Sequence, residues 1–160
     1  MTEKILAKLQ SRFNEFILST DEFRNEMTIV IAKDHIVEVC QFLRDDDELR
    51  FDSLRDVCGT DQHKPGDRFE VVYNLFSLKT KFRLRLKVRV SEDDLHVRSV
   101  TGVWPTANFE EREAYDMFGI IFLNHPDLRR IYMMDNFEHY PLRKDYPLMG
   151  LPGAVELPKK

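Results

Sequence analysis

The stretch from Arg68 to Val90, RFEVVYNLFSLKTKFRLRLKVRV, decides the fold of this chain. Its second half alternates one residue at a time between cations and mainly apolar residues. The cations are Lys79, Lys81, Arg83, Arg85, Lys87 and Arg89, and the others are Thr80, Phe82, Leu84, Leu86, Val88 and Val90. A period of two residues is typical of a β-strand with one buried face. The stretch therefore predicts an antiparallel hairpin, with strands over 68–76 and 79–90 joined at Ser77 and Leu78.

The segments before the hairpin predict two helices and two strands. A helix over 3–18 carries six apolar residues on one face: Ile5, Leu6, Leu9, Phe13, Phe16 and Ile17. A polar link over 19–26 leads to a short β-branched strand over 27–32. Asp34 is placed to cap a second helix, whose apolar residues are Ile36, Val37, Cys40 and Leu43. A further strand is expected over 51–58.

After the hairpin, a short strand or turn over 95–100 precedes a third helix. Asn108 and Glu111 have the spacing of a capping box, and Gly119 suits the left-handed residue that follows a helix end. Arg112 and Asp116 stand at i and i+4 and can pair along one helix face. For residues 1–118, this order of elements predicts a two-layer α+β domain with a mixed, mostly antiparallel sheet packed by helices.

Residues 119–160 predict a long extended tail. Prolines at positions 126, 141, 147, 152 and 158 remove backbone donors and favour extended geometry. The tail nevertheless carries many apolar residues, and ordering it costs roughly 1 kcal/mol or more per residue. It must therefore lie on another surface. Its length and proline content favour the surface of a partner protein over that of its own body.

Four runs of residues carry a family resemblance in this last third: Glu111–Glu113, Asp116–Ile120, His125–Ile131 and Pro141–Leu148. Together they closely resemble the C subunit of respiratory complex I, which is the thirty-kilodalton subunit of NADH:quinone oxidoreductase. The upstream half resembles the family more weakly, through Leu54, Arg55 and Asp56, followed by Asp61. One departure is His139, which stands where the family usually has Gly. If that Gly serves a positive φ, the turn must differ here.

The resemblance implies a non-catalytic structural subunit of the peripheral arm. Its assembly passes electrons from NADH through FMN and iron–sulfur clusters to quinone and couples this transfer to proton translocation. The resemblance further implies docking chiefly on the D subunit, and also near the B and I subunits, at the cytoplasmic face of the bacterial inner membrane. Membrane association would be indirect, and no cofactor is expected in this chain. The residues expected to contact partners are Glu111, Arg112, Glu113, Asp116, His125, Pro126, Arg129, Arg130, Pro141, Arg143, Lys144, Asp145 and Tyr146.

Composition excludes several classes of function. A net charge of −4 argues against a general binder of nucleic acids or anionic membranes. The sequence has no run of 18 apolar residues that could span a bilayer, and its start, MTEKILAKLQSRF, lacks the apolar core of a secretory signal. Cys40 and Cys58 are far apart and lack CxxC spacing, which favours reduced, packed thiols.

Two alternatives to this function remain open. The equivalent subunit of a related membrane-bound hydrogenase or photosynthetic complex would keep the architecture and change the electron donor. A nucleic-acid-binding module could use the basic strand 79–89 to follow phosphates. The solvent face of a half-covered sheet, paired with acidic residues such as Glu70, explains the same pattern with fewer assumptions, since no aromatic residues stand on the basic face to stack with bases.

Metal and catalytic sites have weak support in the sequence. The third helix carries four carboxylates, Glu110, Glu111, Glu113 and Asp116, but lacks the Glu-x-x-His spacing of di-iron bundles. His125 and His139 have no Cys or His partner at ligand spacing. Charge pairing within the chain or across an interface is therefore the favoured interpretation of these residues, and no catalytic or metal-binding residue is expected.

Overall fold

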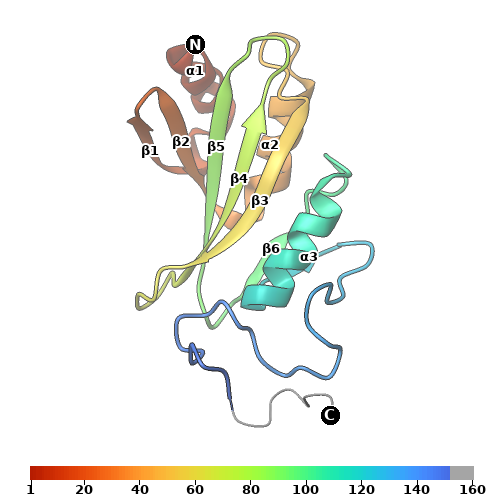
Figure 1. Ribbon diagram of the computed structural model, residues 1–160. Helices are drawn as coiled ribbons and strands as arrows, with labels where there is room; N and C mark the ends of the chain where they lie inside the picture. Colours follow the sequence, from red (N-terminus) through yellow and green to blue (C-terminus); the bar gives the residue numbers. More distant parts are fainter. Residues whose placement is uncertain (152–160) are drawn as a thin grey trace.

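A five-stranded sheet forms the centre of the computed structural model, which describes residues 1–151 (Figure 1). The spatial order of its strands is β1-β2-β5-β4-β3. Strands β2 and β5 run parallel, and the other neighbouring pairs are antiparallel. The prediction of a mixed, mostly antiparallel sheet is therefore confirmed. The strands are β1 (Ile17–Phe23), β2 (Glu26–Ile31), β3 (Ser53–Asp61), β4 (Phe69–Phe76) and β5 (Arg83–Val90).

The β4–β5 hairpin forms as expected, but its turn is longer than the sequence suggested. Strand β5 begins at Arg83 rather than at Lys79, because residues 77–82 form a turn in which Lys81 has a φ of +57°. The Ser77 hydroxyl accepts the Thr80 N–H within this turn at 3.1 Å and ties the turn to the rest of the chain by donating to the Leu49 carbonyl at 2.6 Å. Two of the six predicted cations therefore leave the strand, and four remain on its polar face.

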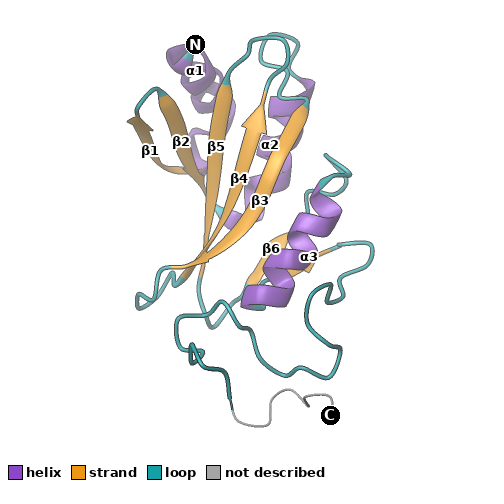
Figure 2. Ribbon diagram, viewed as in Figure 1, coloured by secondary structure: helices purple, strands orange, loops and turns teal. Residues whose placement is uncertain are grey.

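Two helices cover one face of the sheet, α1 (Thr2–Phe13) and α2 (Ile36–Asp45), and both lie behind the strands in Figure 2. The alternate residues of the hairpin face them and are almost completely buried: Phe69, Val71, Tyr73, Leu75, Leu84, Leu86, Val88 and Val90. At about 25 cal/mol per Å² of apolar area removed from water, this layer is a major source of stability. The period-two pattern thus defines the core face of the sheet.

Two details of the N-terminal half differ from the sequence prediction. Residues 17–23, expected within the first helix and a polar link, form the edge strand β1, whose side chains are nearly all exposed. Its pairing with β2 comes from the backbone, so no alternation marks it in the sequence. Asp34 lies in a short 3₁₀ turn, Lys33–His35, and no side-chain cap precedes α2. A second 3₁₀ turn, Asn14–Phe16, follows α1.

The third helix, α3 (Ala107–Phe118), packs alongside the outer strand β3. A Cβ at Gly59 of β3 would lie 2.6 Å from the Phe118 ring, so glycine is what permits this close approach. The predicted capping box is wrong, because Asn108 lies inside the helix and Glu111 bonds elsewhere. The predicted helix end is confirmed, because Gly119 is left-handed with a φ of +80°.

The chain after α3 starts with one short strand and then becomes irregular. Strand β7 (Ile121–Leu123) pairs in parallel with β6 (His96–Arg98). Residues 124–151, here called the strap, contain no further helix or strand and run beneath the end of the sheet in Figure 1. Residues 152–160 of the predicted tail lie outside the described part. Within residues 1–151, no helix is long and apolar enough to cross a bilayer.

Candidate partner interface

A single carboxylate, that of Asp116, fixes the first half of the strap. It projects from α3, is fully buried, and accepts three backbone hydrogen bonds through Oδ2. The donors are the N–H groups of Ile131, Tyr132 and Met133, at 3.1, 2.7 and 3.0 Å. Arg130 donates to Oδ1 at 2.7 Å. Burial opposes ionisation of Asp116, but these four donors outweigh it and lower the pKa of its carboxyl.

Two arginines complete this anchor. Arg112 donates from α3 to the carbonyls of Arg129 and Arg130 at 3.1 and 3.4 Å, so the predicted pairing of Arg112 with Asp116 is wrong. Arg130 also donates to the His139 carbonyl at 3.2 Å. The strap therefore binds both members of the expected helix pair, Arg112 and Asp116. His139 is not among the residues with positive φ, so this position needs no glycine.

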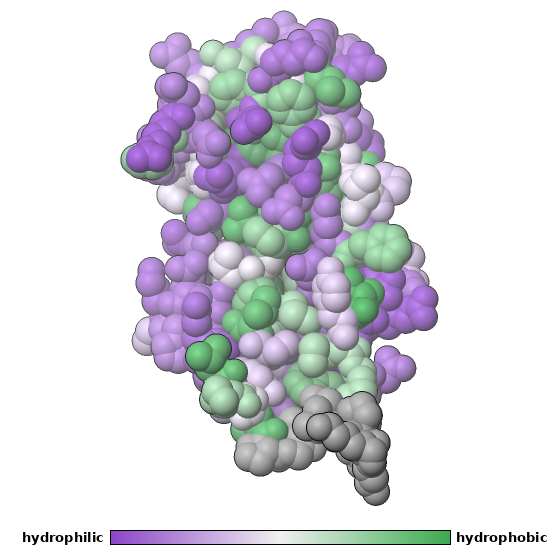
Figure 3. All heavy atoms as spheres, in the orientation of Figure 1, coloured by the Kyte–Doolittle hydropathy of each residue, from purple (hydrophilic) through white to green (hydrophobic). Residues whose placement is uncertain are grey.

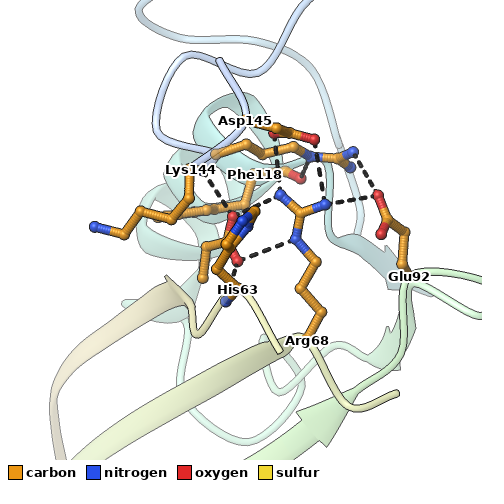
Figure 4. A network of polar contacts seen from close by, with 8 residues as sticks. His63, Arg68, Glu92, Phe118, Lys144 and Asp145 are labelled. Atoms are coloured by element: carbon orange, nitrogen blue, oxygen red, sulfur yellow. Dashed lines mark hydrogen bonds and ion pairs between the residues drawn. The ribbon is translucent and has the colours of Figure 1, made fainter. Parts of the chain in front are cut away.

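A second anchor joins the far end of the strap to the sheet, as Figure 4 shows. Asp61, at the end of β3, accepts a bidentate pair of bonds from Arg68 at 3.1 and 2.8 Å. The same carboxylate accepts the Lys144 backbone N–H at 2.8 Å. Arg68 also pairs with Asp145 at 3.0 Å and Glu92 at 2.9 Å. Burial opposes ionisation of Asp61, but its donors prevail and hold the pKa of this carboxyl well below its usual range.

Arg143 connects the strap to the end of α3. Its Nε donates to the Phe118 carbonyl at 2.7 Å, and its guanidinium lies 5.1 Å from the Phe69 ring centre and 4.7 Å from that of Tyr140. The Phe118 carbonyl belongs to the last turn of α3, where carbonyls lack partners within the helix. A Cβ at Gly119 would lie 2.7 Å from Tyr140 and 2.8 Å from Arg143, so this glycine gives the strap room.

Glu111 is the second fully buried carboxylate of α3. It accepts hydrogen bonds from the Ser99 hydroxyl at 2.6 Å and from the Val100 N–H at 2.7 Å. Its Oε2 lies 4.0 Å from Nε2 of His125, whose ring bonds the Asn108 carbonyl at 3.0 Å. Burial raises the pKa of the Glu111 carboxyl to about 7, although the two hydrogen bonds oppose that effect.

The thirteen residues expected to contact partners divide into two groups. Buried or largely enclosed within this chain are the side chains of Glu111, Arg112, Asp116, His125, Arg130 and Arg143. Their polar groups have partners within the chain: most of them hold the strap, and Glu111 binds the segment that follows β6. Exposed or half-exposed are Glu113, Pro126, Arg129, Pro141, Lys144, Asp145 and Tyr146. For this second group, contact with a partner stays a prediction.

The strap presents apolar side chains to solvent, while two of its arginines, Arg130 and Arg143, turn inward to the body. The exposed members are Tyr132, Met134, Leu142, Leu148, Met149 and Leu151, of which Leu148 and Met149 are almost completely exposed. Figure 3 shows hydrophobic side chains at the surface of this end of the molecule, at the bottom of the view. Burial of such residues is the usual state in a folded chain, and a group of them at the surface indicates a contact site for another protein. Met149 was not predicted from the sequence, because its surroundings have no period.

The basic strand is not an open cationic track. On β5, Arg85 donates to Glu26 at 2.9 Å, and Lys87 donates to Glu70 at 3.0 Å. Pairing with Glu70 was the alternative expected from sequence. This neutralisation gives no support to the nucleic-acid hypothesis, because a phosphate-binding strand needs free cations.

The metal and thiol candidates are also accounted for by packing. No group of three or more His, Cys, Asp or Glu residues within 1–151 is arranged to hold a metal ion. Cys40 and Cys58 are free thiols, buried and half-buried, and burial raises the pKa of Cys58 to about 11. Such a thiol stays protonated at neutral pH and is a poor nucleophile.

Comparison with known proteins identifies the family. Residues 29–151 match the family described as "Respiratory-chain NADH dehydrogenase, 30 Kd subunit". The chain belongs to this family. The C subunit of NADH-quinone oxidoreductase from Geotalea uraniireducens is 50% identical over 147 residues, which cover 92% of this chain and 88% of that protein. The protein of the same name from a Roseiflexus species is 48% identical, with coverages of 96% and 86%.

Two solved structures share the fold of this family member. One is described as "Nqo5 of the trypsin-resistant fragment (1-134)" and has a TM-score of 0.67 at 30% identity, covering 79% of this chain and 98% of the fragment. The other is a chain of the membrane-bound sulfane sulfur reductase, an archaeal respiratory membrane complex. It has a TM-score of 0.78 at 21% identity, with coverages of 92% and 86%. This second likeness shows the fold alone.

Proposed function

We propose that this chain is a non-catalytic structural subunit of the peripheral arm of a proton-translocating NADH:quinone oxidoreductase. The observation that carries the proposal is the strap, which arginines and backbone N–H groups hold against the body while Leu148, Met149 and other apolar side chains stay exposed. An apolar surface held in one conformation is prepared for docking, because the entropy of ordering it has been lost before the partner arrives. Family membership supplies the partners, which are other subunits of the complex.

The D subunit is the proposed main neighbour, with the B and I subunits close by, at the cytoplasmic face of the bacterial inner membrane. Exposed charges accompany these apolar residues: Arg129 and Lys144 belong to the strap, and Glu113 accepts the Tyr132 hydroxyl at 3.3 Å. A polar rim around an apolar centre is the usual anatomy of a protein–protein interface. Membrane association of this chain is proposed to be indirect, through the assembled complex.

The redox chemistry is proposed to belong to the other subunits, which bind NADH, FMN, iron–sulfur clusters and quinone. What supports this division is the way this chain uses its buried carboxylates. Asp61 and Asp116 order the strap, and Glu111 ties α3 to the segment that follows β6. These roles are structural, and they occupy the side chains that would otherwise be candidates for cofactor binding.

Affinity purification from detergent-solubilised membranes tests the proposal. A tagged copy of the chain should retain the D, B and I subunits together with the flavin-containing subunit, as identified by mass spectrometry. The isolated chain should show no flavin or iron–sulfur absorption. Recovery of hydrogenase subunits in place of a flavin subunit would favour the related complex instead. Stoichiometric flavin or iron in the isolated chain would contradict the non-catalytic role.

A further inference from the structure

A cleft at the other end of the sheet is not used by the strap. It has a volume of about 440 Å³ and lies where β2 and β5 begin and β4 ends. These strand ends lie at the top of the sheet in Figure 1, and the lining residues Asn74 and Arg85 alternate along their strands with the buried residues that face the helices. The strap lies below the lower end. The residues that line the cleft include Glu26, Arg55, Asp56, Asn74, Phe76, Arg83 and Arg85.

The floor of the cleft is a continuous polar chain across four strands. Arg85 donates to Glu26 at 2.9 Å and to Oδ1 of Asn74 at 3.3 Å. The Asn74 amide in turn donates to Asp56 at 3.2 Å. Each of these groups therefore has a partner within the chain. Such a network holds the floor in one arrangement. Two other arginines of the cleft, Arg55 and Arg83, lie outside this network and are available to bind a ligand.

Those two arginines, Arg55 and Arg83, flank the ring of Phe76. Arg83 is the cross-strand neighbour of Phe76, and the Arg55 guanidinium lies 5.9 Å from the centre of its ring. Both arginines are exposed, and among residues 1–151 neither side chain forms an ion pair or hydrogen bond. The cleft thus carries two unneutralised guanidinium groups beside an aromatic surface.

The position of Arg55 depends on a bulge in β3. Leu54 pairs with Leu75 and Asp56 pairs with Asn74, so Arg55 is the extra residue between them. A bulge changes the direction of a side chain that regular pairing would fix. Here it brings Arg55 to the ring of Phe76 and opposite Arg83, instead of leaving it in the regular alternation of the strand.

We propose that this cleft is a second docking site, which receives a carboxylate-rich segment of a neighbouring subunit. Arginine binds carboxylates through two parallel hydrogen bonds, and two unpaired guanidinium groups fit two acidic side chains, or one side chain and a chain terminus. With the strap at one end of the sheet and the cleft at the other, the chain would connect two neighbours. This role is additional to that of the strap and uses different residues.

The chemistry is tested on the isolated full chain with hexaglutamate as the probe and hexaglutamine as the neutral control. Hexaglutamate should shift the backbone amide signals of residues 54–56, 74–76 and 83–85 in NMR spectra. The R55Q/R83Q double variant should weaken this binding about tenfold or more, since a hydrogen bond to a charged group is at least that strong. The K64Q/R89Q variant makes the same change of charge outside the cleft and should bind as the wild type does. Equal weakening by both variants, or shifts spread over the surface, would overturn the proposal.

The source of the ligand is tested in the assembled complex. A photo-crosslinking analogue of phenylalanine replaces Phe76, so that both arginines stay in place, and mass spectrometry identifies what it captures after irradiation of isolated membranes. A peptide of another subunit with at least two Asp or Glu residues near the crosslink is the expected result. Capture of a phospholipid, of a segment without acidic residues, or of nothing would overturn the proposal. The crosslinking chain keeps an unchanged strap, so this experiment and the strap variants test the two hypotheses independently.

Discussion

Asp116 is the residue on which the position of the strap depends most. Its carboxylate receives three consecutive backbone N–H groups and the side chain of Arg130. All of these donors point at one buried acceptor group, so no other nearby residue can replace it. An Asn side chain would turn an N–H group towards some of these donors, which leaves buried donors unpaired.

The Asp116→Asn variant is therefore expected to lose on the order of 3 kcal/mol of stability, as when one partner of a buried pair is removed. Limited proteolysis with trypsin should then cut after Arg129 and Arg130 at a protease concentration that spares the wild type. Asp127→Asn is the matched control, because the Asp127 carboxylate is half exposed and pairs at 2.9 Å with the exposed Arg129. Resistance of D116N equal to that of D127N would show that the carboxylate does not anchor the strap.

The buried Glu111 gives the stability a defined dependence on pH. Its pKa is raised from 4.5 to about 7 by burial, so the folded state holds a proton more tightly than the unfolded state does. The stability from this group is fully present below about pH 4.5 and is lost as pH rises through about 7, with a size on the order of 3 kcal/mol. Asp61 and Asp116 have lowered pKa values, so their contributions are lost only in acid.

The Glu111→Gln variant should remove this decrease. The Gln amide can accept from Val100 and donate to the Ser99 hydroxyl, so the hydrogen bonds are kept without a titrating group. Urea unfolding at pH 4.5 and pH 8 measures the difference. Relative to the wild type, the free energy of unfolding of the variant should be higher at pH 8 than at pH 4.5. A pH dependence equal to that of the wild type would contradict its assignment to Glu111.

At the scale of elements, the strap and the body pack as one unit. Phe137 is buried, Leu128 and Met133 pack against the core, and Arg143 lies over Phe69. The sequence separated a body, 1–118, from a tail, because periodicity stops near Gly119. Hydrophobic burial needs no period, so an irregular segment can contribute to a core without any repeating pattern.

Truncation after Leu123 is accordingly expected to destabilise the chain by on the order of 3 kcal/mol, since it removes one buried aromatic residue and both strap anchors. Thermal unfolding followed by circular dichroism measures the effect. A chain ending at Leu151 keeps the strap contacts and serves as the control. If both chains melt at the same temperature, the strap would not belong to the folded unit.

Local patterns predicted some elements well and others poorly. The hairpin, both buried helices and the glycine that ends α3 follow from alternation, helical stripes and backbone geometry. The edge strand β1 was missed because its exposed side chains leave no pattern. The network of Asp61, Arg68 and Lys144 was missed for another reason. Asp61 and Lys144 are 83 residues apart, and nothing in either local sequence indicates the contact.

At the scale of the whole molecule, the two ends of the sheet have different surfaces. The strap end is apolar and held in place from within, whereas the cleft end carries two unpaired arginines. A protein that connects two neighbours requires such a difference, because each neighbour can then bind a surface of different chemistry. The effect of a substitution at one end can therefore be measured while the surface at the other end stays unchanged.

The most direct test changes the two most exposed apolar residues of the strap. In the Leu148→Asp/Met149→Asp variant, the melting temperature of the isolated chain should stay unchanged, because the two side chains are 101% and 95% exposed and support no packing. Native gels of membranes from cells that express only this variant should show that it fails to enter the complex, because two charges would have to be buried at the interface. The matched control, Leu18→Asp/Phe23→Asp on the remote edge strand β1, should assemble normally. Assembly of the strap variant at the wild-type level would contradict docking through the strap.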